Sequence, residues 1–287
     1  MSNQKQATIV IPSFNEEKGI QNVLEDMKKF GNDFEIIVVD DGSEDSTSNI
    51  VKKYPGVKLI SHDVNRGYGA AIKTGVRCAS SDIIIITDAD ATYPSHRIPD
   101  LLKKYREGNI DMVVGARTGE NVKIPSIRKP AKWFIKKLAD YLSGENIVDI
   151  NSGLRLIRKD LVKKFNRILP EGFSFTMTIT LALLTNGYRV EYIPIDYHKR
   201  KGKSKLRPVR DTYGFLKLIV RTVLYFQPLK VFMPLSFLFF IVGLILLMYR
   251  IFVAEAFVTT ITLLFMAAFQ LFIVGLLADL IDKRMKD

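Results

Sequence analysis

The stretch IIIITDADATYP, residues 83–94, places two aspartates directly behind a wholly apolar run. A short, continuous apolar run that ends in turn-forming residues is typical of a strand buried on both faces. Asp88 and Asp90 stand one residue apart at its end, where neighbouring carboxylates repel each other. Oxygen ligands at this spacing suit Mg²⁺ or Mn²⁺, which commonly also binds substrate phosphates. Alone, the pair could equally cap a surface turn, so its meaning depends on the rest of the chain.

Short apolar strands alternate with helical stretches on both sides of this run. The expected strands cover residues 7–12, 34–43, 57–62, 82–90 and 111–117, and the expected helices about 17–30, 45–54, 66–79 and 94–107. This alternation predicts a parallel α/β sheet covered on both faces, whose ligands bind beyond the carboxyl ends of the strands. The charged side chains at or just past those ends are Asp40, Asp41, Asp88, Asp90 and Arg117. We therefore expect one site along that edge.

The C-terminal part of the sequence contains two long uncharged apolar runs, at residues 231–249 and 257–278. Each is close to the roughly 20 residues that a helix needs to cross a bilayer. Two buried helices of a soluble core are the alternative, but two such runs with a short link favour a helical hairpin in the membrane. Basic residues flank its outer ends: Lys230, Lys283, Arg284 and Lys286. The positive-inside rule then places both termini and the preceding domain in the cytoplasm, at the cell membrane.

Residues 211–230, just before the hairpin, are mostly apolar with Lys217 and Arg221 four residues apart. This pattern predicts an amphipathic helix that lies in the membrane interface, or one that packs on its own domain. The predicted organisation is therefore a catalytic domain over residues 1–210, an interfacial helix over 211–230, and a hairpin with a short tail over 231–287.

The chain of 287 residues carries a formal net charge of +12, which indicates acidic partners such as nucleic acid, anionic lipid or phosphorylated small molecules. Nucleic acid is not expected, because the basic residues do not alternate with aromatic ones and no known binding motif appears. The single cysteine, Cys78, excludes an intrachain disulfide and a cysteine zinc cluster. Neither a dinucleotide loop nor a phosphate loop is complete, since Ile72 and Tyr197 stand where each needs a glycine.

Four motifs in order carry a resemblance to a known family. They are VIPSFNEE at 10–17, IIVVDDGSEDST at 36–47, NRGYGAAIKTG at 65–75 and TDADATYP at 87–94. Together they resemble the inverting glycosyltransferases of family 2, which have the GT-A fold. The segments GAR at 115–117, DINSGLRLIRKD at 149–160 and KRKGKSK at 199–205 are similar to the subgroup that contains dolichyl-phosphate mannose synthase and its bacterial polyprenyl-phosphate relatives. The resemblance covers about residues 7–210.

The resemblance implies a binding role for individual residues. The nucleotide would lie against Pro12, Phe14, Glu16, Asp40, Asp88, Ala89, Asp90 and Arg117. Asp88 and Asp90 would hold Mg²⁺ or Mn²⁺, with Asp90 the firmest ligand. The phosphates of the donor or of a lipid acceptor would meet Arg128, Arg155, Arg200 and Lys205. One departure stands at Thr92, where the mannose synthases usually carry glutamine, so both a third metal ligand and the sugar donor are left open.

The implied reaction is inverting transfer of a single sugar from a nucleotide-diphosphate sugar, of GDP-mannose or UDP-glucose type, to polyprenyl or dolichyl phosphate. Asp90, Arg117 and Asp149 are the catalytic candidates. An anionic lipid phosphate needs no strong base, whereas a sugar-hydroxyl acceptor would need one. Asp149 is the candidate for that base, although it could equally orient Arg155. A third alternative is an inactive transferase fold that serves as a membrane scaffold.

The processive polysaccharide synthases of the same family carry a Gln-x-x-Arg-Trp motif. The only tryptophan here, Trp133, follows Lys132, and Lys129 stands in the glutamine position. The motif is therefore absent, and two spans are few for a polymer channel. Relatives that assemble in membranes make a homo-oligomer, such as a tetramer, a further expectation.

Overall fold

The computed structural model describes residues 5–118, 137, 140–141, 144–172, 174–198, 227–253 and 257–284. Within these residues seven strands form one sheet in the order β3-β2-β1-β4-β6-β5-β7. Their bounds are β1 Ala7–Ser13, β2 Phe34–Asp40, β3 Val57–Ser61, β4 Ile83–Ile86, β5 Met112–Ala116, β6 Arg155–Arg158 and β7 Val190–Pro194. The strands predicted up to residue 117 are all present. Each ends at or just before the polar residues that follow its apolar run.

The sheet is mostly parallel, with one strand reversed. Strands β1 to β4 run parallel to one another, and β5 runs parallel to β7, but β6 is antiparallel to both β4 and β5. Arg155, the first residue of β6, pairs with Ile86, the last residue of β4. The chain before β6 therefore returns to the edge where β4 ends and enters the sheet from there. This reversed strand brings Gly153, which lies just before it, beside Asp88.

The isoleucine run of β4 is buried on both faces, as its composition predicted. Ile85 packs in one core cluster, whereas Ile84 and Ile86 pack in the cluster on the opposite face. Each fully buried side chain of this size contributes about 1.5–3 kcal/mol. The strand is therefore a rigid base for the polar residues that follow it.

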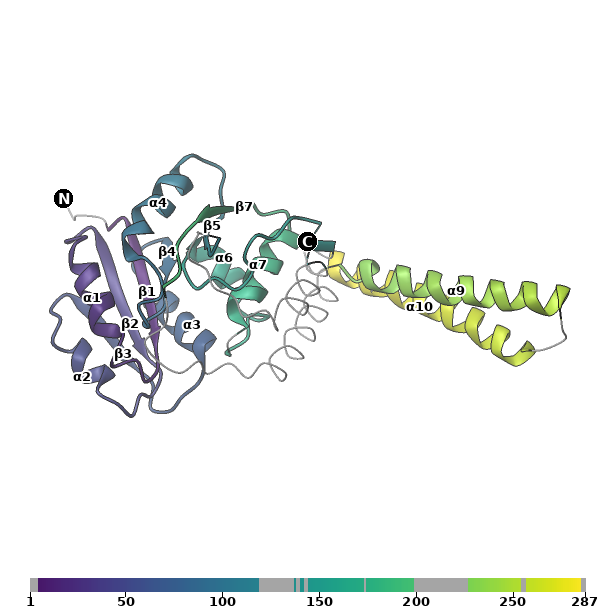
Figure 1. The fold of residues 1–287 in the computed structure, drawn as a ribbon, viewed down its shortest axis with the longest axis horizontal. Helices are drawn as coiled ribbons and strands as arrows, with labels where there is room; N and C mark the ends of the chain where they lie inside the picture. The colour runs from purple at the N-terminus through teal and green to yellow at the C-terminus, as the bar shows by residue number, and fades with distance from the viewer. Residues whose placement is uncertain are drawn as a thin grey trace.

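Helices cover both faces of the sheet (Figure 1). One cluster contains residues of α1 and α4, and the other contains residues of α3, α6 and α7. The bounds are α1 Ile20–Lys28, α2 Thr47–Val51, α3 Tyr68–Cys78, α4 Ile98–Arg106, α6 Lys159–Lys164 and α7 Phe175–Thr185, with a short 3₁₀ helix η1 at Ser95–Arg97.

The strand order reverses between β1 and β4. The chain runs from β1 outward through β2 to β3, and then returns to place β4 on the other side of β1. Ligands of open α/β sheets bind at such a reversal, outside the carboxyl ends of the strands. The segments that follow β1, β2 and β4 meet there.

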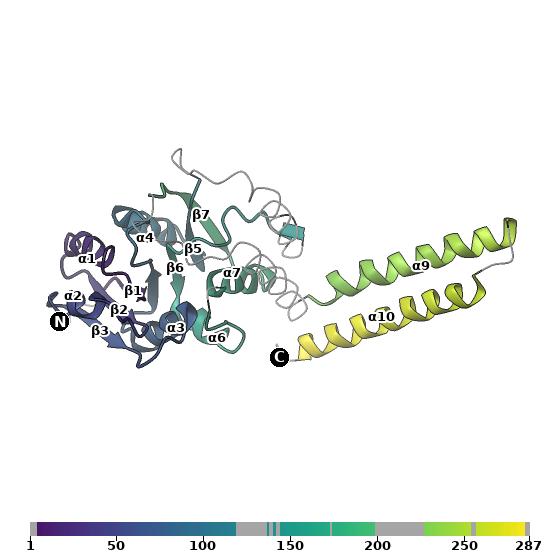
Figure 2. The same ribbon diagram turned by 60° about the horizontal axis from the view of Figure 1, so that its bottom comes forward.

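Two long helices, α9 Leu229–Phe252 and α10 Val258–Arg284, form an antiparallel hairpin that projects from the sheet domain (Figures 1 and 2). Only 6% of the most apolar stretch of α9 and 17% of that of α10 are buried, which contradicts the alternative of a soluble core. Small residues let the helices approach, since a Cβ at Gly275 would lie 2.8 Å from Phe232. The hydroxyl of Ser236 donates to the carbonyl of Ala268 at 2.8 Å. Both helices have the length and composition of membrane spans.

The interfacial helix expected at 211–230 lies almost wholly outside the described residues, so that helix and the domain boundary at 210 stay predictions.

Candidate functional site

The turn after β4 holds Asp90 in a defined orientation. The Asp90 side chain accepts two hydrogen bonds at Oδ1, from the backbone N–H of Thr92 at 3.1 Å and from its hydroxyl at 2.6 Å. Ala91 between them has φ of 58°, a left-handed conformation that non-glycine residues rarely adopt. Thr92 is fully buried, and its carbonyl accepts the N–H of His198 at 2.9 Å. The hydroxyl of Thr92 therefore donates its hydrogen bond to Asp90 and helps to orient that carboxylate.

Backbone packing fixes the same turn from the other side. A Cβ at Gly19 would lie 2.6 Å from the carbonyl oxygen of Ala89, so only glycine lets the start of α1 approach this closely. The sequence offered no particular signal for Gly19 beyond its place after the first strand. Local strain in Ala91 together with tight packing is typical of a functional turn held in place by its surroundings.

Asp88 lies between a tyrosine and a glycine. The hydroxyl of Tyr68, the first residue of α3, donates to Asp88 Oδ1 at 2.8 Å. Burial, and then the charge of Asp88, raises the pKa of Tyr68 well above its ordinary value, so the phenol stays protonated. On the other side, a Cβ at Gly153 would lie 2.6 Å from Asp88 Oδ2. Neither Tyr68 nor Gly153 was singled out from the sequence.

The two aspartates after β2 organise loops. Asp40 accepts the N–H of Ser43 at 3.1 Å and a hydrogen bond from the Ser48 hydroxyl. Asp41 accepts the N–H groups of Arg66 and Gly67 at 2.9 and 2.7 Å, and it also contacts His62 Nδ1 at 2.7 Å. Each of the two residues is only 3% exposed. Contact between Asp40 and a nucleotide stays a prediction, whereas Asp41 joins the ends of β2, β3 and α3.

The residues expected to line the base and ribose follow directly from β1. Pro12 is buried within the strand, and Phe14 and Glu16 are half-buried beyond it. The N–H of Glu16 donates to the hydroxyl of Thr47 at 2.9 Å. The N–H of Asn15 donates to Ser43 in the same way, at 2.9 Å. The loops after β1 and β2 are therefore tied together into one wall beside Asp40.

The glycines of the NRGYG segment permit close packing. A Cβ at Gly69 would lie 2.1 Å from the carbonyl oxygen of Pro170, and the N–H of Ala70 donates to the carbonyl of Glu171 at 2.9 Å. The 170–172 turn thus covers the start of α3. Close packing against this turn therefore explains why glycine is needed at position 69, although the segment does not form a dinucleotide-binding loop.

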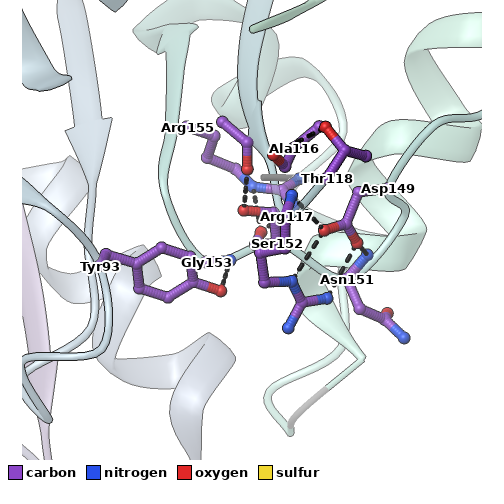
Figure 3. Close-up of polar contacts among 10 residues, drawn as sticks. Tyr93, Ala116, Arg117, Thr118, Asp149, Asn151, Ser152, Gly153 and Arg155 are labelled. Carbon is purple, nitrogen blue, oxygen red and sulfur yellow. Dashed lines mark hydrogen bonds and ion pairs between the residues drawn. The ribbon is translucent and has the colours of Figure 1, made fainter. Parts of the chain in front are cut away.

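Arg117 and Asp149 form a bidentate ion pair past the end of β5 (Figure 3). Arg117 Nε and Nη2 donate to the Asp149 carboxylate at 2.7 and 2.9 Å, and the Arg117 backbone N–H donates at 3.1 Å. The two side chains are 19% and 13% exposed. The guanidinium also lies over the ring of Tyr197, 5.3 Å from its centroid. Tyr197 in turn packs edge-on against Tyr93.

The pair shifts the pKa of both groups toward the charged forms. Burial alone would lower the pKa of Arg117, but the hydrogen bond and charge of Asp149, together with Tyr93 and Tyr197, raise it. Burial would likewise raise the pKa of Asp149, but Arg117 holds it below its usual range. A carboxylate so stabilised is a weak proton acceptor. Asp149 therefore pairs with Arg117, whereas the sequence had left open that it orients Arg155.

Among the residues that the structure describes, Arg155 is the largest fully buried side chain, with 0% exposure. Its Nη1 donates to the carbonyl of Thr176 at 2.9 Å and to the hydroxyl of Thr180 at 3.1 Å. Its Nε donates to the carbonyl of Ser152 at 3.1 Å, as Figure 3 shows. This position is unsuited to binding a phosphate, so that expectation for Arg155 is corrected. The arginine instead anchors the turn that lies beside Asp88.

The remaining basic candidates, Arg128, Arg200 and Lys205, lie outside the described residues, and their phosphate contacts stay predictions. Within the described part of the chain, no group of three or more His, Cys, Asp or Glu could hold a metal ion. The assignment of Asp88 and Asp90 as ligands of Mg²⁺ or Mn²⁺ stays a prediction.

Residues 8–165 match glycosyl transferase family 2, and residues 227–283 match the GtrB C-terminal hairpin. The chain belongs to glycosyl transferase family 2. The family model covers the sheet edge that carries Asp40, Asp88, Asp90 and Arg117. The chain is therefore a glycosyltransferase by family, and the resemblance expected from its motifs is confirmed.

Two relatives from Haloferax volcanii illustrate the likeness. The chain is 30% identical over 217 residues to a dolichyl-phosphate hexose transferase, across 75% of this chain and 93% of that protein. It is 28% identical over 221 residues to the low-salt glycan biosynthesis hexosyltransferase Agl6, across 74% of this chain and 52% of that protein.

Among solved structures, glucosyl-3-phosphoglycerate synthase from Mycobacterium tuberculosis, in complex with Mn²⁺, uridine diphosphate and phosphoglyceric acid, has the same fold. The TM-score is 0.62 with 17% identity, over 76% of this chain and 78% of that one. The expected GT-A architecture is confirmed. At this identity the likeness concerns the fold alone.

Proposed function

We propose that the protein transfers one sugar, with inversion, from a nucleotide-diphosphate sugar to a polyprenyl or dolichyl phosphate. The observation that carries the proposal is the presence, in one chain, of a carboxylate-bearing edge at the reversal of the sheet and a hairpin of membrane length. The first element suits a nucleotide sugar. The second element holds the domain where a lipid acceptor lies. The name of the Haloferax dolichyl-phosphate hexose transferase supports this substrate class.

The aspartates fit a divalent ion delivered with the donor. Mg²⁺ is commonly bound by one or two protein carboxylates together with substrate phosphates, so two aspartates suffice. Hydrogen bonds from the N–H and the hydroxyl of Thr92 orient the carboxylate of Asp90 in advance. Bound there, Mg²⁺ or Mn²⁺ would neutralise charge on the diphosphate leaving group. The Mn²⁺ in the structurally similar synthase is consistent with this assignment.

The chain's own residues would stabilise the negative charge that the metal ion does not neutralise. An oxygen of the lipid phosphate forms the new bond to the anomeric carbon, and the nucleoside diphosphate leaves with the electron pair of the old one. The acceptor is already anionic, so no proton has to be removed from it. Arg117, held by Asp149, would offer a fixed positive charge to a phosphate. The low pKa of Asp149 disfavours the alternative in which it activates a sugar hydroxyl.

The hairpin would keep the site at the cytoplasmic face of the cell membrane, with both chain termini on that side. The basic residues at the outer ends of the spans support this orientation. A homo-oligomer such as a tetramer is part of the proposal only as an expectation from the family.

Purified protein in detergent tests the reaction. Radiolabelled UDP-glucose and GDP-mannose are each supplied with undecaprenyl or dolichyl phosphate, in Mn²⁺, Mg²⁺ or EDTA. We expect label to enter the lipid phase as a single sugar, with one donor preferred and EDTA inhibitory. Label that appears only on a sugar hydroxyl of a glycolipid would establish the alternative acceptor. If no sugar is transferred from either donor, the result would contradict the proposal and favour the alternative of an inactive membrane scaffold.

A further inference from the structure

Asp88 is enclosed by two contacts that the proposed reaction does not itself explain. The Tyr68 hydroxyl donates to Oδ1 at 2.8 Å, and the backbone of Gly153 packs against both oxygens. A Cβ at position 153 would lie 2.6 Å from Oδ2 and 2.7 Å from Oδ1. One contact is directional and the other is steric. Between them they restrict the rotation of the carboxylate.

Tyr68 is itself held by its helix terminus. The N–H of the preceding Gly67 donates to Asp41 Oδ2 at 2.7 Å, and the N–H of Ala70 donates to the carbonyl of Glu171 at 2.9 Å. These bonds fix the first turn of α3 to β2 on one side and to the 170–172 turn on the other. The phenol therefore approaches Asp88 from a rigid element.

Hydrogen bonds also hold Gly153 and the turn around it in place. The N–H of Gly153 donates to the hydroxyl of Tyr93 at 2.6 Å (Figure 3). The hydroxyl of Ser152 donates to the carbonyl of Gly115 at 2.5 Å. Buried Arg155 binds the carbonyl of Ser152. A fully buried arginine is expensive to desolvate, and here its hydrogen bonds define the turn that faces Asp88.

We propose that Tyr68 is a positioning residue that, against the backbone of Gly153, sets the orientation in which Asp88 meets a metal-bound nucleotide diphosphate. The inference rests on the proposed donor site. Hydrogen-bond partners of metal-binding carboxylates orient those ligands, and their removal typically weakens metal affinity or activity about 10–100-fold. In this role Tyr68 acts through Asp88.

Nucleotide binding measured by calorimetry, with Mn²⁺ and without it, tests the inference independently of turnover. UDP and GDP serve as probes. In Tyr68→Phe the ring remains and only the hydroxyl is lost. We expect nucleotide affinity in Mn²⁺ to fall about 10–100-fold, with affinity in EDTA unchanged. A purely structural tyrosine would weaken both or neither.

A matched control removes the same kind of hydrogen bond elsewhere. The hydroxyl of Tyr54 donates to Glu25 at 2.7 Å, and Tyr54 stands just before β3, at the sheet edge opposite the site. Tyr54→Phe should leave metal-dependent binding at the wild-type value. Gly153→Ala approaches Asp88 from the other side with Tyr68 intact, and it should reproduce the Tyr68→Phe defect.

Asp88→Asn separates this inference from the function on which it rests. If Asp88→Asn abolishes metal-dependent binding while Tyr68→Phe and Gly153→Ala bind like wild type, the positioning role is overturned and the donor site stands. If Asp88→Asn itself binds like wild type, the donor-site assignment fails, and the role of Tyr68 fails with it.

Discussion

The carboxyl edge of the sheet and the C-terminal hairpin are stabilised in opposite ways. At the edge, carboxylates such as Asp41, Asp88 and Asp90 each accept hydrogen bonds from particular donors at defined positions. In the hairpin, long apolar faces are exposed along both helices, and a single hydroxyl, that of Ser236, donates across the described interface. Buried polar groups require matched partners, whereas apolar contact with lipid requires only composition. Single substitutions should therefore matter far more at the edge than in the hairpin.

The largest effect is expected at Asp90. Asp90→Ala removes the carboxylate that Thr92 orients, and it should lower sugar transfer by about a hundredfold or more, as loss of a group that stabilises developing charge does. Incorporation of labelled sugar into lipid measures it, with the thermal unfolding midpoint as a control for folding. Equal turnover by the variant would remove Asp90 from the reaction.

The next effect concerns the ion pair of Arg117 and Asp149. Asp149→Ala leaves a largely buried guanidinium without its partner and should cost about 3 kcal/mol of stability, visible as a lower unfolding temperature. Asp149→Asn retains the side-chain shape and should cost less. If both variants unfold at the wild-type temperature, the pair contributes nothing to the fold.

The pair also predicts the sign of a pH effect. The folded-state pKa of Asp149 lies below its unfolded value, so its stabilisation is present above the unfolded pKa of about 3.9 and is lost as the pH falls through the folded value. The thermal unfolding temperature of the wild type should therefore fall in that acid range. Asp149→Asn should lack this part of the decline, and identical pH profiles for both proteins would contradict the shift.

A smaller effect is expected at Thr92. Thr92→Val retains the shape but loses the hydroxyl bond to Asp90, and kcat/KM should fall about tenfold, at the lower end of what loss of a supporting hydrogen bond produces. Thr92→Ser keeps the hydroxyl and should restore most of the rate. A serine variant as slow as the valine variant would show that packing, and not the hydrogen bond, is what matters.

The smallest effect is expected in the hairpin. Ser236→Ala removes its hydrogen bond to Ala268 and should change hairpin stability by about 0.6 kcal/mol, with sugar transfer unchanged. Phe237→Leu on the exposed face of α9 is the control and should change neither quantity. A loss of transfer in Ser236→Ala comparable to that in Thr92→Val would erase the contrast between the two regions.

Some features followed from the sequence because they depend on local pattern. The apolar run of β4 predicted a strand buried on both faces, and the long uncharged runs predicted α9 and α10. The order of motifs predicted the family. Each of these depends on residue type and spacing along the chain, which tertiary contacts did not override.

Other features were beyond reach because they depend on residues far apart in the chain. The segment RLIR gave no sign that β6 would run antiparallel between β4 and β5. Arg155 was expected to bind a phosphate because its segment resembles the family motif, yet carbonyls of α7 and of the 152 turn make its burial favourable. The pairing of Asp149 with Arg117 depends on the geometry, and the sequence did not predict it.

The sequence by itself determined that an apolar strand carries Asp88 and Asp90 to the ligand edge of a family 2 glycosyltransferase, and that a hairpin of membrane length follows. Only the tertiary structure decided how those carboxylates are aimed. Tyr68 and Gly153 reach Asp88 from a helix and a turn distant in the chain, while Thr92 secures Asp90 locally. Periodicity specifies which face of a strand is buried, but the direction of a hydrogen bond is set by where separate elements pack.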